Sequence, residues 1–290
     1  MIGKLLAARL DQMLRQQLDD GSGRPLDFSQ PVGEPALVPA DSISWQVFAN
    51  PVSLVIGGIT AVLLELAEPK VRSGVWDHTT FRTDPLKRMR RTGMAAMVTV
   101  YGARSQATRM ISGVRRMHEK VRGTTPGGIP YEANDPELLR WVHATAAFGF
   151  LEAYHHYVRP LDQTERDRYY AEGAPISRLY GAEQAPETER ELMELFNATL
   201  PQLEPSAILS EFLGIMESLP LLPRPLRFMN KTIISASVEL LPPEIRMKLG
   251  LRERLPAAAA TKILRFIARQ ADRLELESSP AVQARKRMNF

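Results

Sequence analysis

The side chains in this sequence that are best suited to bind a metal or move a proton are its five histidines. They are His78, His118, His143, His155 and His156, and the chain of 290 residues contains no cysteine. The absence of cysteine excludes disulfides, zinc–thiolate sites, iron–sulfur clusters and thiol nucleophiles. A metal in this protein would therefore be bound by histidine or by carboxylates.

Two of these histidines fall on the apolar faces of expected helices. A helix expected at 105–122, ended by Gly123, places His118 on a face of inward-pointing apolar side chains that includes Met117. A second helix, beginning at Asp135-Pro136 with a capping residue and a proline, places His143 in an apolar column. A single inward histidine is ordinarily a neutral core residue. Two on neighbouring helices also fit a site in which one is the axial ligand of an iron porphyrin.

A basic segment is expected at the start of a third helix. This helix begins at Asp84-Pro85, and its residues Arg88 and Thr92, four apart, share the face beside its apolar stripe. Its cations are suited to anchor the propionates of a porphyrin. Lys87 and Arg90 point away from that side and are better explained as a solvated basic face.

Other constellations are weaker. Glu152 and His155 have the Glu-x-x-His spacing of di-iron bundles, but that fold needs two such units and the sequence has one. His155 and His156 are therefore interpreted as the polar end of a helix. His78 is expected in a loop before Asp84, from which it could reach the mouth of a pocket. The motifs of Ser-His-Asp hydrolases, Walker-type kinases and nicotinamide-dependent enzymes are missing.

The elements that would position these residues are predicted to be helices. Proline and glycine clusters separate segments with helical apolar spacing, and 44% of the residues are hydrophobic. We expect one large all-α domain: an N-terminal helix and loop at 1–44, the main domain at 45–255, and a helical tail at 256–290. Breaks between helices are expected at 72–84, 172–186 and 220–225.

The charge and apolar patterns exclude some partners. The net charge of +4 is dispersed among acidic residues, so a nucleic-acid partner is not expected. The most apolar run, Val52 to Ala67, is short for a bilayer span and contains Glu65, which favours a buried core helix over a transmembrane segment. These features predict a soluble, cytoplasmic protein.

Several motifs together resemble a known family. They are Gly57-Gly58-x5-Leu64, Gly74-Val75-Trp76-Asp77-His78, Phe81-x-x-Asp84-Pro85-x-x-Arg88-x-x-x-Thr92, Arg115-Arg116-Met117-His118-x-x-Val121-x-Gly123, and Tyr131-x-Ala133-x-Asp135-Pro136 followed by Trp141-Val142-His143. With weaker matches as far as residue 251, they resemble the MpaB-type oxygenases, a family that includes the rubber oxygenase called latex clearing protein.

The resemblance implies an all-α fold with a globin-like core, a non-covalent haem b and oxidation by dioxygen. It implies that His118 is the iron ligand and that Arg88 and Thr92 place polar groups around the haem. Arg91 stands where the rubber-cleaving member has a lysine able to approach the iron, and arginine is a poor ligand because it stays protonated. His143 is expected in or beside the pocket as a distal or supporting residue, and His78 near its mouth.

The expected substrate is a hydrophobic small molecule of lipid, terpenoid or aromatic type, because the apolar stripes would line the pocket. Such an oxidation needs electrons from a donor protein or from the substrate itself. The alternative from a different class is a helical binding module that holds a hydrophobic ligand without chemistry. A di-iron carboxylate oxidase is the weaker alternative.

Overall fold

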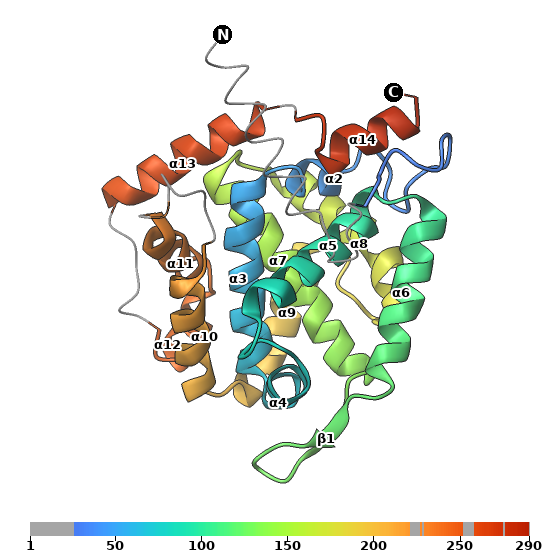
Figure 1. The fold of residues 1–290 in the computed structure, drawn as a ribbon. Coiled ribbons are helices and arrows are strands. Elements are labelled where there is room, and N and C mark those ends of the chain that lie inside the picture. The colour runs from blue at the N-terminus through green and yellow to red at the C-terminus, as the bar shows by residue number, and fades with distance from the viewer. Residues whose placement is uncertain (1–25, 221–226, 228, 252–257, 275, 290) are drawn as a thin grey trace.

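The computed structural model describes residues 26–220, 227, 229–251, 258–274 and 276–289, and helices dominate them (Figure 1). The expectation of an all-α single domain is confirmed. The helix expected near the N-terminus, most of the break expected at 220–225 and the domain boundary expected at residue 255 lie outside the described residues. A globin-like arrangement of the core stays a prediction.

The elements follow one another in a simple order. The N-terminal half contains α2 (Ile43–Val47), α3 (Pro51–Ala67), α4 (Pro69–His78), α5 (Pro85–Tyr101), α6 (Arg104–His118) and the strands β1 (Arg122–Thr124) and β2 (Pro130–Glu132). The remainder contains α7 (Pro136–Tyr157), α8 (Gln163–Tyr180), α9 (Glu189–Thr199), the short 3-10 helix η1 (Leu200–Gln202), α10 (Ala207–Ser218), α11 (Asn230–Glu239), α12 (Pro243–Lys248), α13 (Ala258–Asp272) and α14 (Pro280–Arg287).

The helices α3 and α7 lie at the centre and are packed closely against each other (Figure 1). A Cβ atom on Gly57 would lie 2.6 Å from the carbonyl oxygen of Gly149, and one on Gly149 would lie 2.4 Å from the carbonyl oxygen of Gly57. Only glycine at both positions allows this approach of the two backbones. The apolar run that begins at Val52 is therefore a core helix, as expected, and most of its side chains are buried.

No single helix in the described ranges has the length and apolarity needed to cross a bilayer. The pair α3 and α4 reaches that length only across a bend of 111°.

Three expected boundaries were wrong. The helix expected to continue to residue 122 ends at His118, and Arg122–Thr124 instead forms an antiparallel hairpin with Pro130–Glu132. Gly123 is not a helix cap but a strand residue, and a Cβ atom there would lie 2.7 Å from the hydroxyl oxygen of Tyr131, which would have to move. Met117, expected on the apolar face, is 49% exposed.

The other two boundary errors concern α4 and α8. The break expected at 72–84 contains most of α4, whose start is capped by the carboxylate of Glu68 accepting from the Val71 amide at 2.7 Å. The break expected from residue 172 is also incorrect, because α8 continues through Pro175 to Tyr180 and ends at Gly181, where φ is +103°. The side chain of Pro175 is exposed, so the carbonyl it leaves unpaired can be hydrated.

Candidate functional site

The structure brings the two inward histidines together. His118 is the last residue of α6, and His143 lies two turns into α7. Burial, and to a smaller extent the nearby His118, lowers the pKa of His143 to about 4. Burial also lowers the pKa of His118, followed by the positive charge of Arg88. Both imidazoles are therefore neutral at pH 7, which is the form that can bind a metal through a ring nitrogen.

Arg88 and Thr92 meet on the first turns of α5, as their spacing predicts. The Arg88 guanidinium donates to the Thr92 hydroxyl, which in turn donates to the Arg88 carbonyl at 3.0 Å. The same guanidinium lies 5.4 Å from the ring centroid of Phe81. Burial lowers the Arg88 pKa, the charge of Glu65 opposes that shift, and Arg91 adds to it. Arg88 is thus a partly buried cation within electrostatic reach of both Glu65 and His118.

Glu65 is a functional candidate that the sequence reasoning did not assign. It comes from α3 and is partly buried among apolar side chains. Burial raises its pKa to about 7, and Arg88 only partly offsets this effect. A carboxyl group with this pKa exchanges its proton readily at neutral pH. The signal in the sequence was its position as the acidic residue inside the apolar run Val52–Ala67.

The apolar helix faces that carry Glu65 and His143 are only partly covered by other residues. On α3, Gly58 and Val62 share the face of Glu65 and are partly exposed, as are Ala146 and Phe150 on the His143 face of α7. A Cβ atom on Gly58 would meet only the Phe150 ring, at 3.8 Å. Partial exposure of aligned apolar residues on two neighbouring helices is what a surface that receives an apolar ligand requires.

A neighbouring amide faces His118. Nδ1 of His118 is buried without a hydrogen-bond partner, and so is Oδ1 of Asn134. The amide of Asn134 is held by its Nδ2, which donates to the Arg115 carbonyl at 3.1 Å. Its proximity partly offsets the lowering of the His118 pKa by burial and by Arg88. An imidazole that binds metal through one nitrogen commonly donates its other N–H to such an oxygen.

His143 is fixed by α8. Its Nδ1 lies 3.3 Å from the Ser177 hydroxyl, and its ring centroid lies 5.0 Å from that of Tyr180. The hydroxyl of Tyr180 lies 2.9 Å from that of Thr99 on α5, so the α8 side chains link His143 to the helix that carries Arg88. The ring is held as a neutral polar group at the edge of the apolar surface.

Two residues predicted to belong to the site, His78 and Arg91, are exposed. His78 is at the exposed C-terminal end of α4 and not in a loop, because that helix continues through residues expected to be irregular. Its Nε2 lies 3.2 Å from the Tyr131 hydroxyl of the hairpin, and the contacts of the described residues do not bring it to His118 or His143. Arg91 is exposed beside Arg88. Catalytic roles for His78 and Arg91 stay predictions.

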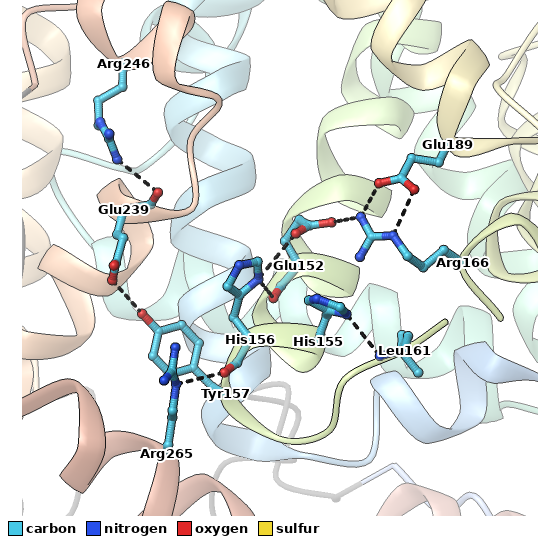
Figure 2. Close-up of polar contacts among 10 residues, drawn as sticks. All are labelled: Glu152, His155, His156, Tyr157, Leu161, Arg166, Glu189, Glu239, Arg246 and Arg265. Atoms are coloured by element: carbon cyan, nitrogen blue, oxygen red, sulfur yellow. Dashed lines mark hydrogen bonds and ion pairs between the residues drawn. The ribbon is translucent and has the colours of Figure 1, made fainter. Parts of the chain in front are cut away.

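The Glu-x-x-His spacing has a structural explanation (Figure 2). The Glu152 carboxylate accepts from Arg166 and lies 3.3 Å from Nδ1 of His156, while Arg166 also binds Glu189 through Nε at 2.9 Å. Nδ1 of His155 accepts from the Leu161 amide at 3.0 Å. Within the described ranges, no group of three or more His, Asp and Glu side chains could hold a metal ion. The network links α7, α8 and α9 and does not resemble a di-iron site.

Comparison with known proteins agrees with the sequence motifs. Residues 45–273 match the family described as "ER-bound oxygenase mpaB/B'/Rubber oxygenase, catalytic domain". The chain belongs to this family. No curated protein and no solved structure matches the chain. As a member of the MpaB and rubber oxygenase family, the protein is an enzyme of the oxygenase type, and the matched region contains His118, His143, Arg88, Thr92 and Glu65.

Proposed function

We propose that this oxygenase uses haem b and dioxygen to oxidise a hydrophobic small molecule. The observation that supports the proposal most is the setting of His118, a neutral imidazole beside the partly buried Arg88 and the partly exposed apolar surfaces of α3 and α7. A haem needs an axial imidazole, an apolar slot and cations for its propionates. Residues of α3, α5, α6 and α7 offer a candidate for each of these requirements.

The available ligand set also fits a haem better than a metal ion bound by the protein alone. A single histidine is enough for an iron whose other ligands come from a porphyrin, whereas a protein-only site needs several side chains. The described residues offer no such group. The buried, unpaired Nδ1 of His118 lies beside Asn134, so that Nε2 is the nitrogen left to bind iron.

When bound, the haem would supply the centre at which dioxygen is activated. His118 would hold it, and Arg88 would neutralise a propionate through a charge-assisted hydrogen bond, with Thr92 fixing the guanidinium. Burial and, after it, the Arg88 charge lower the pKa of His118 and so favour the unprotonated imidazole.

Glu65 is suited to hold or release a proton near the substrate. Its pKa of about 7 makes either form accessible at neutral pH. His143 stays neutral because its pKa is about 4, so it acts as a hydrogen-bonding group held by Ser177. The partly exposed apolar residues around them favour a lipid-, terpenoid- or aromatic-like substrate, which would cover them from water when bound. Electrons would come from a donor protein or from the substrate.

Haemin titration of the full chain tests this proposal. We expect one haemin per chain with a saturable Soret change, and pyridine haemochrome analysis should identify protohaem. His118→Ala should either fail to retain haem or retain it only when imidazole is added. His143→Ala should retain haem, with an altered spectrum. A chain that remains colourless under these conditions would support the non-catalytic binding module instead.

Arg88 provides a quantitative arm of the same test. A charge-assisted bond to a propionate is worth on the order of 1.5–3 kcal/mol, so Arg88→Ala should weaken haemin binding by about one to two decades. Arg88→Lys should lose less because it keeps the charge. Arg90→Ala, an exposed residue on the same helix, is the control. Equal affinities of Arg88→Ala and Arg90→Ala would remove the propionate role.

A further inference from the structure

The helix α13 has an inner face that is well packed and an outer face that is unusually apolar. Thr261, Leu264 and Ala268 are buried, and the helix packs against α3, α7 and α11. On the outer side Ile263 is 49% exposed and Phe266 is 64% exposed. These two residues, three apart, lie on one face of the helix. Leu274, which follows soon after the end of the helix, is a third exposed apolar side chain, at 45%.

Basic side chains flank this apolar face. Lys262 and Arg269 are exposed on α13, and Arg273 is exposed directly after it. Arg285 and Lys286 are exposed on α14, which lies at the same end of the molecule as α13, opposite the β1–β2 hairpin (Figure 1). Between residues 258 and 289, the acidic residues that the structure describes are Asp272 and Glu277, and Asp272 accepts a hydrogen bond from Asn50 at 3.3 Å.

An apolar face bordered by cations is the pattern of a helix that lies in a membrane interface. The apolar side chains enter the boundary between headgroups and acyl chains, and lysine and arginine contact the lipid phosphates. We propose that the outer face of α13, defined by Ile263, Phe266 and Leu274 with their basic flank, binds the surface of a membrane that contains anionic lipids.

The charge distribution favours this occupant over a second copy of the chain. Two α13 helices packed face to face would bring Lys262, Arg269 and Arg273 close to the same residues of the partner, and like charges repel at such distances. An anionic lipid surface offers charges of the opposite sign to the same residues. The proposal does not depend on haem, so it stands or falls separately from the proposed function.

Vesicle co-sedimentation of the full chain tests it. Vesicles of phosphatidylcholine with phosphatidylglycerol should bind the protein, vesicles of phosphatidylcholine alone should bind it far less, and high salt should release it. Lys262→Gln and Arg273→Gln should each weaken binding about fivefold, since a basic residue near such a surface contributes about 1 kcal/mol. Phe266→Ser should abolish most of the binding.

The control is Ile129, an apolar residue that is 49% exposed, as Ile263 is, but lies between β1 and β2 at the other end of the molecule. Ile129→Ser should bind vesicles as the unchanged protein does. A tryptophan at each site gives a second readout: the emission of Phe266→Trp should shift to the blue on adding anionic vesicles, and that of Ile129→Trp should not.

Two outcomes would overturn the proposal. One is equal vesicle binding by Phe266→Ser and Ile129→Ser. The other is a dimer, detected by light scattering, that Phe266→Ser dissociates while no vesicle binding occurs; α13 would then be an interface between copies. Circular dichroism of each variant verifies that the fold is retained, which these exposed positions favour.

Discussion

Replacing Glu65 by glutamine should stabilise the folded protein at alkaline pH but not at acidic pH. The ordinary pKa of this carboxyl is 4.5, and burial raises it to about 7 in the folded chain. The folded state therefore binds the proton more tightly than the unfolded state does. Below pH 4.5 the carboxyl is protonated in both states and has no destabilising effect. Between pH 4.5 and 7 the cost of ionising it in the fold grows, and above pH 7 this cost is constant.

The size of the effect follows from the same two pKa values. The difference between 4.5 and about 7 corresponds to about 3 kcal/mol, at 1.36 kcal/mol for each pKa unit. Because Glu65 retains partial exposure, solvent screens its charge and about 2 kcal/mol is the expected gain for Glu65→Gln at pH 8. The gain should fall to nothing at pH 4.5.

Urea denaturation at intervals between these pH values measures the difference between the two proteins. Taking the difference removes the contributions of all other titrating groups. Glu119→Gln, which removes an exposed negative charge just after α6, is the control for net charge. A gain that is the same at pH 4.5 and pH 8 would refute the reasoning. A loss of stability at pH 8 would mean that the attraction between Glu65 and Arg88 exceeds the cost of burial.

Three further predictions concern the surroundings of this group. Gly57→Ala should lower the free energy of unfolding by about 1–3 kcal/mol in thermal denaturation, because the new Cβ atom would lie 2.6 Å from the Gly149 carbonyl oxygen. Gly58→Ala, where a Cβ atom has room, should instead stabilise α3 by about 0.5–1 kcal/mol. Because the pKa of the partly buried His143 is about 4, the unfolded chain binds this proton more tightly than the folded chain, and stability should fall by about 2–3 kcal/mol between pH 6.5 and pH 4. This loss should be missing in His143→Gln. Asn134→Leu should change the His118 tautomer seen in ¹⁵N NMR spectra of the haem-free chain. The control is Asn230→Leu, which should leave the tautomer unchanged; it removes an amide that likewise donates to a backbone carbonyl and has a buried, unpaired Oδ1. An unchanged tautomer in both variants would exclude a hydrogen bond from Nδ1 of His118 to Asn134.

The parts of the fold that the sequence predicted are those with local signals. The starts of α5 and α7 are marked by Asp84-Pro85 and Asp135-Pro136, in which the aspartate caps the helix and the proline fits its first turn. The end of α6 was missed because its cause is tertiary. Gly123 belongs to a strand, and Tyr131 from the paired strand occupies the space above it. A glycine at this position could equally end a helix, so the residue type alone does not distinguish a helix end from a strand residue with a close neighbour.

In the candidate site, too, the features with a local sequence signal were predicted and those that depend on tertiary packing were missed. The helical faces that carry His118 and His143 were readable from apolar spacing, and their helices do bring the two imidazoles together. The link from Glu65 to Arg88 was not readable, because α3 and α5 are joined through α4 and their relative placement depends on packing. Asn134 was missed for a similar reason: its amide reaches Arg115 only after the hairpin folds back against the end of α6.

The charges of the site connect ligand binding to proton uptake. At pH 7 both His118 and His143 are neutral, Glu65 is about half ionised, and Arg88 is the cation that lowers the pKa values of Glu65 and His118. A propionate paired with Arg88 would neutralise that cation and add a negative charge, and both changes favour the protonated form of Glu65. Because about half of the Glu65 carboxyls already carry a proton at pH 7, haemin binding at that pH should take up about half a proton per chain. The same binding by Glu65→Gln should not, so the proton balance of the titration distinguishes a haem seated against Arg88 from one bound elsewhere on the surface.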